Sequence, residues 1–377
     1  MIPVLRPTID EKTAQELLRV LESGWWGCGE KTAEFERRFA EKVGAQYAIG
    51  TSSATAALDL CLKAHAIRSG ELIVPALTFV ADAAVGDWNN MDVTLADVEE
   101  DSHCLDPEAI VLTQQTRAVI VVNLHGRLAN VQRLRERFTG LIIEDNAHAM
   151  FTPGTCRHSD VAVWSFHAVK TMPAGDGGMV TTNDRQIAER VRSLSSFGMT
   201  RRVYERASQG KYDWDYDILE GGGLKAYMND ITAVLGLGQL ARIEQMNARR
   251  RFIQAYYNAA FRDLPGVQLP PYSHTVQHYV LRSSNRAELS EFLAQRNIAT
   301  AVHYKPLSEM TYWKKAVKRP LPVTGRVWPQ ILTLPVHDAL TDEQVVHITD
   351  SVRRFFGRTP SSLPLKDPAL QPVQTQD

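Results

Sequence analysis

Short apolar segments alternate with segments of helical periodicity from Thr32 to about Asp184. This alternation is typical of a β-sheet wound by crossover helices. The segments expected to be strands are aliphatic and nearly free of charge, as are strands buried on both faces of a sheet. The expected strands are Tyr47–Gly50, Leu72–Pro75, Ala118–Asn123 and Leu141–Glu144, and the helices between them include Ala54–Ala66 and Val131–Phe138.

The alternation breaks after Asp160, where two expected strands are joined by a glycine-rich loop and no helix. These strands are Val161–Phe166 and Met179–Thr182. Further on, apolar spacing predicts one long helix from about Asp230 to Phe261 that links two lobes. The second lobe is expected to be a small α+β domain, with a strand over His278–Ser283, a helix over Ala287–Asn297 and a strand over Ala299–Tyr304.

These patterns divide the chain into four parts. We expect an N-terminal arm (1–24), a large α/β domain (25–245), a small C-terminal α+β domain (246–357) and a disordered, proline-rich tail (358–377).

Charge and composition exclude several classes of function. Lysine and arginine number 42 against 43 acidic residues, so no overall positive field favours a nucleic acid or an anionic membrane. No apolar run approaches the ~20 residues of a membrane span. The N-terminus lacks a secretory signal, and the cysteines are widely spaced without a Cys-x-x-Cys pair. We therefore expect a cytoplasmic protein without disulfides or structural zinc; the cysteines are Cys28, Cys61, Cys104 and Cys156.

A lysine in the loop after the Val161–Phe166 strand is the first candidate for chemistry. Lys170 follows Ser165 and His167 and precedes Gly175, Gly177 and Gly178. In a tight turn at a strand end its amine can lose water, which favours the neutral, nucleophilic form that attacks an aldehyde. The alternative is an ordinary surface lysine of a hairpin.

An aspartate at the end of another strand is the second candidate. Asp145 follows Leu141–Glu144 at the carboxyl end, where open α/β sheets bind ligands. Its carboxylate can pair with a protonated pyridine nitrogen and keep that ring an electron sink, or it can simply cap a following helix. His148 could donate to a phenolic oxygen of the ring, or be a core histidine.

The segment Gly50–Leu58 turns from a strand into a helix through small hydroxyl residues. A helix N-terminus with Ser53 and Thr55 nearby favours a phosphate. Plain N-capping is the alternative reading.

Together these segments resemble the DegT/StrS group of nucleotide-sugar aminotransferases, which are fold type I enzymes dependent on pyridoxal 5'-phosphate (PLP). The resemblance runs from about Gly24 to about Phe356. It rests on Ser165-Phe166-His167 with Lys170, Gly175 to Gly178, Glu144-Asp145 with Ala147-His148-Ala149, Ser53-Ala54-Thr55 with Ala57-Leu58, Pro75 with Thr78-Phe79-Val80, and His303-Tyr304. It implies a large domain with a mainly parallel, seven-stranded sheet and a smaller α+β domain.

The resemblance also implies roles for single residues. Lys170 would hold the cofactor as an imine and move the proton during catalysis, Asp145 would bind the pyridinium nitrogen, and Phe79 would stack on the ring. The remaining cofactor contacts would come from Ser53, Ala54, Thr55 and Ser165 around the phosphate and from His148 near the phenolic oxygen. The substrate end would include Trp25, Trp26, His303 and Asp176, an aspartate where the family usually has glutamate.

By the same resemblance the protein is a homodimer whose phosphate site is completed by the neighbouring chain. The family's asparagine at that place is not aligned here, which leaves Lys225, Asn229 or Tyr227 for this contact. The amino donor would be L-glutamate. The acceptor would be a keto sugar, most often a nucleotide-linked keto-deoxysugar.

Four alternatives differ in their chemistry. An aminocyclitol aminotransferase acting on a keto-inositol fits the same site. Dehydratase relatives have histidine in place of the lysine, so Lys170 favours amino transfer. A PLP-binding regulatory protein would predict a damaged site, whereas Lys170, Asp145 and His148 are all present. A metal hydrolase using Asp145, His148 and His167 leaves the lysine and the glycines unexplained.

Overall fold

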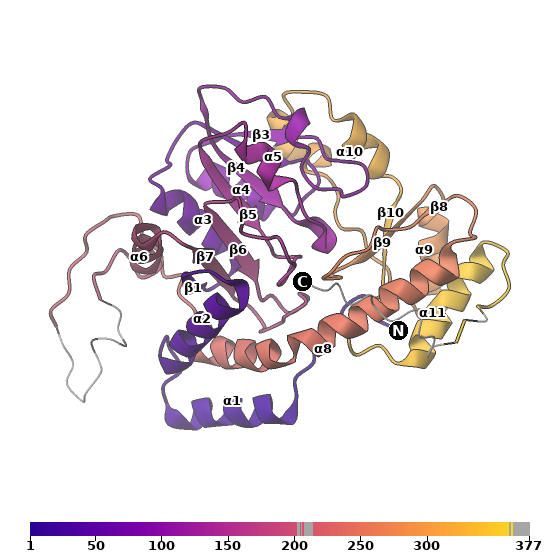
Figure 1. Cartoon of the computed structure of the whole chain (residues 1–377), viewed down its shortest axis with the longest axis horizontal. Helices are drawn as coiled ribbons and strands as arrows, with labels where there is room; N and C mark the ends of the chain where they lie inside the picture. Colours follow the sequence, from indigo (N-terminus) through magenta and orange to yellow (C-terminus); the bar gives the residue numbers. More distant parts are fainter. Residues whose placement is uncertain (202–203, 205, 207–213, 362, 365–377) are drawn as a thin grey trace.

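The computed structural model describes residues 1–201, 204, 206, 214–361 and 363–364. A large lobe and a small lobe, each with its own sheet, are joined by the long helix α8 (Asp230–Phe261), as Figure 1 shows. The single long helix predicted over these residues is confirmed. No helix in the described ranges is long and apolar enough to cross a membrane.

The large lobe is built on a sheet of order β1-β7-β6-β5-β4-β2-β3. β2 to β6 pair in parallel, and β7 is antiparallel to both β1 and β6. The mainly parallel, seven-stranded sheet expected from the resemblance is confirmed, including the strand β3 that the apolar pattern did not reveal. The strands are β1 (Tyr47–Thr51), β2 (Glu71–Pro75), β3 (Asp92–Ala96), β4 (Thr116–Val122), β5 (Leu141–Asp145), β6 (Val161–Ser165) and β7 (Gly178–Thr182).

Two groups of helices enclose this sheet. α3 (Ala54–Ala64) packs against α4 (Ala81–Trp88) and α6 (Arg185–Leu194), while α2 (Glu30–Val43) packs against β1 and α8. Every residue of β5, β6 and β7 is buried, and apart from Glu144 and Asp145 at the end of β5 none of them is charged, as expected for strands covered on both faces. The shorter helices of this lobe are α5 (Val131–Arg135), η1 (Pro107–Ala109) and η2 (Leu124–Gly126).

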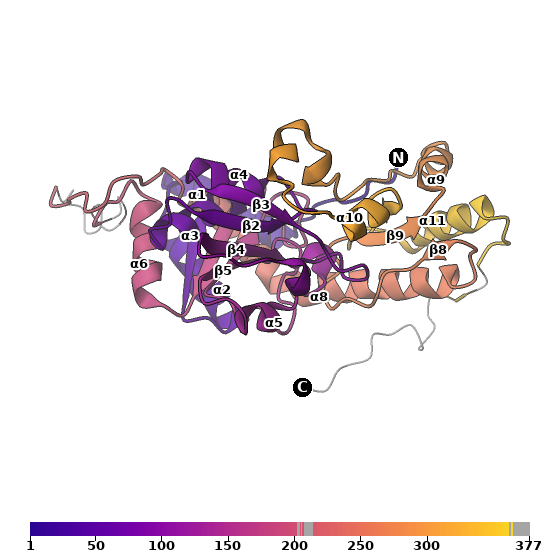
Figure 2. The same cartoon turned by 90° about the horizontal axis from the view of Figure 1, so that it is seen from above.

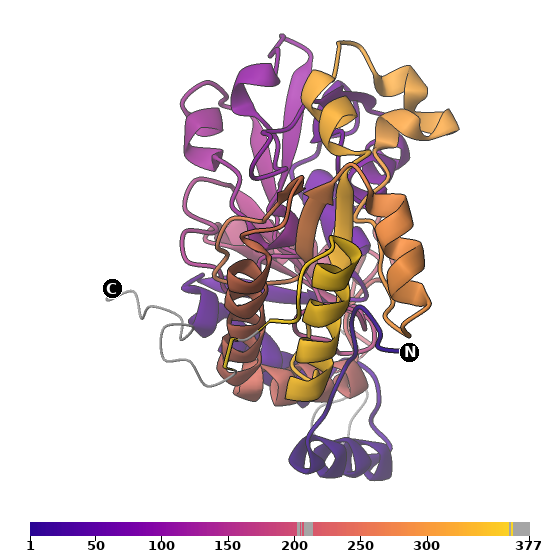
Figure 3. The ribbon, with the colours of Figure 1, turned by 90° about the vertical axis from the view of Figure 1, so that its right-hand side faces the viewer.

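The small lobe contains an antiparallel sheet of order β10-β9-β8. Figures 2 and 3 show it beside the far half of α8, with α11 lying next to that helix. The aromatic rings of Tyr257, Phe261 and Tyr279 pack together in its core. After α8 the chain forms β8 (Val267–Gln268), β9 (Tyr279–Ser283), α9 (Arg286–Ala294), β10 (Ile331–Leu334) and α11 (Asp342–Phe355) of this lobe, while η4 (Leu307–Glu309), η5 (Thr311–Ala316) and α10 (Pro322–Val327) pack against the large lobe.

The N-terminal segment touches both lobes. The backbone of Ile2 pairs with Ile298 of the small lobe, and α1 (Glu11–Ser23) packs on α8. At the other end, the amide of Ser361 donates to Asp350 at 2.8 Å. Residues 365–377, most of the tail predicted to be disordered, lie outside the described residues, and the division into domains stays a prediction.

One predicted strand is wrong. Ala299–Tyr304 makes only a single bridge, between Ala301 and Thr333 of β10. The segment then turns toward the large lobe, where the hydroxyl of Tyr304 bonds His148, while the ring of His303 bonds the Thr333 hydroxyl within the small lobe. Side-chain contacts of the site therefore replace further pairing along the sheet.

Candidate active site

A cleft of about 290 Å³ lies at the carboxyl ends of β5 and β6, against the start of α3. This is the edge at which open α/β sheets bind ligands. Residues predicted from four separate segments of the large lobe meet there with three residues from the small lobe, His278, His303 and Tyr304. The predicted residues lining the cleft are Ser53, Ala54, Thr55, Phe79, Asp145, His148, Ser165, Lys170, Asp176 and His303.

Lys170 lies in the loop between β6 and β7. Its backbone amide donates to the carbonyl of His167 at 2.8 Å, and the Gln277 side chain donates to the carbonyl of Val169 at 2.8 Å, so both lobes fix the turn. Burial lowers the pKa of Lys170 to about 8, and the carboxyl groups of Asp145 and Asp82 oppose this shift. Near neutral pH a substantial fraction of the amine is neutral and can act as a nucleophile.

Asp145 is the last residue of β5 and is only 7% exposed. Its Oδ1 accepts from the backbone amide of Ala147 at 2.8 Å, within a turn. Because no helix follows β5 in the described chain before α6, the helix-capping interpretation of Asp145 is wrong. Burial raises the pKa of this carboxyl, while the Ala147 amide and Lys170 act in the opposite direction.

The start of α3 closes the other end of the cleft. Ser53 is the N-cap of α3, and its hydroxyl accepts from the Ala56 amide at 3.1 Å. A Cβ added at Gly178 would lie 2.5 Å from the amide nitrogen of Ala54, so glycine lets β7 approach this terminus closely. The capping interpretation of Ser53 is therefore correct, and the same helix end also faces the cleft, where it suits an anion.

Buried imidazoles form the wall between the lobes. The His125 amide donates to Nδ1 of His148 at 3.3 Å, so His148 carries its proton on Nε2, 3.1 Å from the hydroxyl oxygen of Tyr304. Nδ1 of His125 lies 3.4 Å from Nδ1 of His278, whose ring stacks on His303 at 3.8 Å. Burial lowers the pKa values of His125, His148 and His278 well below their ordinary range. These rings are neutral hydrogen-bonding groups at neutral pH.

Sequence reasoning missed two residues that line the cleft, Tyr304 and His278. Tyr304 was visible as half of the His303-Tyr304 match, but nothing in its spacing linked it to His148. The trio of the metal-hydrolase alternative does not assemble: in the described chain the grouped ligand atoms belong to His125, His148 and His278, and His167 is not among them. Both ring nitrogens of His148 already have partners, as described above.

Four predicted residues lie away from this cleft in the same chain. Trp25 and Trp26 line a second cleft of about 220 Å³ together with Tyr227. Lys225 is exposed and its backbone pairs with Ser196. Asn229 is the N-cap of α8, where its side chain accepts from the Thr232 amide at 2.8 Å.

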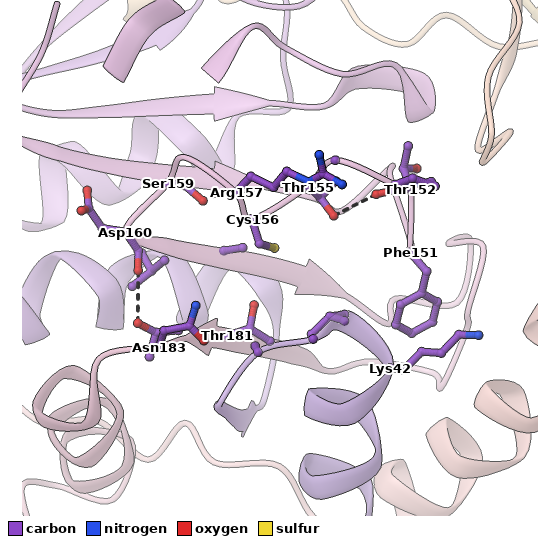
Figure 4. A pocket seen from close by; sticks show the side chains of 18 of the residues that line it. Lys42, Phe151, Thr152, Thr155, Cys156, Arg157, Ser159, Asp160, Thr181 and Asn183 are labelled. Carbon is purple, nitrogen blue, oxygen red and sulfur yellow. Dashed lines mark hydrogen bonds between the residues drawn. The ribbon is translucent and has the colours of Figure 1, made fainter. Parts of the chain in front are cut away.

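A larger hollow of about 1080 Å³ lies elsewhere, shown in Figure 4. It is lined by Val161 and Ala162 at the start of β6, the end of that strand opposite to Lys170. Figure 4 shows Lys42, Phe151 and Cys156 around it. None of the predicted site residues lines this hollow.

Comparison with known proteins identifies close relatives. Residues 7–353 match the DegT/DnrJ/EryC1/StrS aminotransferase family. The spore coat polysaccharide biosynthesis protein SpsC of Bacillus subtilis is 32% identical, over 93% of this chain and 96% of its own length. Spr1654 of Streptococcus pneumoniae, assigned as a sugar aminotransferase and solved in its PMP form, superposes with a TM-score of 0.86 at 29% identity, over 95% of this chain and 99% of that one. DesI, solved in the presence of its TDP-sugar product, superposes with a TM-score of 0.84 at 29% identity, over 95% of this chain and 93% of that one.

Proposed function

Because the chain belongs to the DegT/DnrJ/EryC1/StrS aminotransferase family, we propose that it transfers an amino group from L-glutamate to the carbonyl carbon of a nucleotide-linked keto sugar. It is a PLP-dependent aminotransferase. The observation that carries the proposal is the meeting of Lys170 and Asp145 in one cleft with the N-terminus of α3. The sugar part is supported by the relatives, several of which are sugar aminotransferases.

The residues of the cleft fit the cofactor. Lys170 would bind it covalently, Asp145 would face the ring nitrogen, and the ring of Phe79, which is 53% exposed, would stack on its face. PLP supplies an electron sink that lets an amino group move between two carbon skeletons. The hydroxyl and amide groups around the phosphate would be those of Ser53, Ala54, Thr55 and Ser165.

The electrostatics of Lys170 suit this role. With a pKa of about 8, about one amine in ten is neutral at pH 7, against roughly one in three thousand for an ordinary lysine. The same amine, when released from the cofactor, is placed to take up and return a proton inside the cleft. On the small-lobe side the cleft is lined by His278, which is buried.

We propose further that the active form is a homodimer in which the second chain supplies Lys225 or Asn229 to the phosphate. Neither residue lines its own cleft, and both side chains are exposed. Apolar side chains are exposed on the same part of the chain, with Leu219 at 75% and Ile218 at 54%. Such exposure is typical of an interface.

The proposed acceptor is tested by a half-reaction screen. The pyridoxamine form would be mixed with 3-keto and 4-keto nucleotide sugars and with keto-inositols, and return of the PLP absorbance would be followed. We expect conversion with a nucleotide sugar and none with the Lys170→Arg variant. Conversion of keto-inositols alone would favour the aminocyclitol alternative, and conversion of no carbonyl compound would contradict the proposal.

A further inference from the structure

A second buried carboxyl group, that of Asp82, acts on Asp145. Asp82, in the first turn of α4, is only 1% exposed. The Thr78 hydroxyl donates to its Oδ2 at 2.5 Å, while Oδ1 is buried and has no donor among the described groups. An unpartnered buried carboxyl oxygen is costly, so this one is expected to carry a proton or to meet one.

The missing partner is Asp145. After burial, the charge of Asp145 is the largest influence that raises the pKa of Asp82, and a side-chain hydrogen bond between the two carboxyl groups adds to it, while the charge of Lys170 lowers it. Two carboxylates in contact in a buried site cannot both ionise easily, because each disfavours the charge of the other. The pair therefore holds one proton between its two carboxyl groups.

The surroundings decide which carboxyl group is the acid. Asp145 accepts the Ala147 amide, a bond that stabilises its ionised form. Burial first, and then the charge of Asp145, raise the pKa of Asp82 well above its ordinary value. Asp82 is thus the carboxyl group better placed to keep the proton, with Asp145 as the carboxylate that accepts from it.

We infer that Asp82 is a positioning residue for the cofactor's ring nitrogen, which would face a carboxylic acid–carboxylate pair formed by Asp82 and Asp145. This rests on the proposed placement of the cofactor over Asp145, and it does not depend on which acceptor is used.

The pair has a defined effect on the ring. A buried carboxylate with a raised pKa competes with the pyridine nitrogen for the proton between them. Donation from Asp82 stabilises the negative charge on Asp145 and lowers its basicity. The proton then stays on the ring nitrogen, where the electron sink requires it.

The first test is infrared spectroscopy of the full-length protein without cofactor at neutral pH. We expect the carbonyl band of a buried carboxylic acid in the native protein and its loss in Asp82→Asn. Thr78→Val is the matched control, since it removes the anchoring hydroxyl and leaves both carboxyl groups. A difference spectrum showing the loss of a carboxylate band and no acid band would overturn the inference.

The second test reads the ring directly, by nitrogen NMR of protein loaded with PLP labelled at the ring nitrogen. Asp82→Asn keeps an N–H donor toward Asp145, so the nitrogen should stay protonated as in the native protein. Asp82→Ala removes the donor, so the ring nitrogen should lose its proton at a lower pH than in the native protein. The inference fails if the alanine and native spectra titrate alike, or if Thr78→Val shifts the titration as far as alanine does. Neither the infrared nor the NMR measurement uses an acceptor, so both results are independent of the outcome of the acceptor screen.

Discussion

The hydroxyl of Tyr304 lies 3.1 Å from Nε2 of His148, although the two residues are 156 positions apart. This bond ties the small lobe to the turn that follows Asp145. The ring of Tyr304 also packs against Phe79, with centroids 5.7 Å apart. Tyr304 therefore touches residues proposed to contact two sides of the cofactor.

Replacing Tyr304 with phenylalanine should lower turnover about tenfold, since ~1.4 kcal/mol of lost interaction corresponds to that factor. The buried N–H of His148 would lose its partner while the packing with Phe79 remains. Steady-state kinetics and thermal unfolding would check this. Tyr272→Phe is the control, because Tyr272 is 58% exposed, and an equal loss in both variants would contradict the role.

Replacing Asp145 with alanine should leave the fold largely intact and reduce transamination by several powers of ten. A ring nitrogen without its carboxylate is a much weaker electron sink, and the loss falls on the transition state. Circular dichroism and half-reaction rates would measure the two effects. If the variant unfolds while its folded fraction stays active, the aspartate has only a structural role.

Borohydride should fix the cofactor on the peptide that contains Lys170, as read by mass spectrometry. The rate at which cofactor-free protein captures PLP should rise with pH through a midpoint near 8, the pKa to which burial lowers this amine. Surface lysines ionise near 10.4 and would not follow that curve. Labelling of another lysine, or a midpoint near 10, would rule out this assignment.

Mixing a Lys170→Ala chain with an Asn229→Ser or Lys225→Ala chain should restore part of the activity that each parent lacks, because some heterodimers would have one intact site. Serine keeps the oxygen that caps α8 and removes the amide donors, so helix stability is preserved. Lys12→Ala, a change at an exposed lysine in α1, is the control. An active monomer by sedimentation, or unaltered PLP retention in both variants, would exclude the shared site.

Asp82→Asn should make the cofactor-free protein more stable at neutral pH. The native state keeps the proton of Asp82, whose pKa is raised, while the unfolded chain releases it near 3.8. The native protein therefore loses no stability through Asp82 below that value, and it becomes less stable as the pH rises toward the pKa of Asp82 in the folded protein. Thermal unfolding should show the two proteins alike near pH 4 and the variant higher at pH 7; equal curves at both would show that Asp82 is ionised when folded.

Local patterns were sufficient for much of the site. The mostly aliphatic strands that lead to Asp145 and Lys170, and the hydroxyl residues that begin α3, can be recognised from the sequence immediately around them. The role of Asp82 could not be predicted in this way, since an aspartate in the first turn of a helix usually faces water and nothing in the neighbouring sequence links it to Asp145. The segment 299–304 has the composition of a strand, but the contact of Tyr304 with His148 of the large lobe decides its course.

The 32 residues of α8 span about 48 Å at 1.5 Å per residue. One end packs against α1 and α2, and the other against α11. A hinge between the lobes would have to bend this rod, so large closure around a substrate is disfavoured. The choice among acceptors would then depend on the shape of a nearly rigid cleft entrance, where Tyr304 and His303 of one lobe lie beside Phe79 of the other.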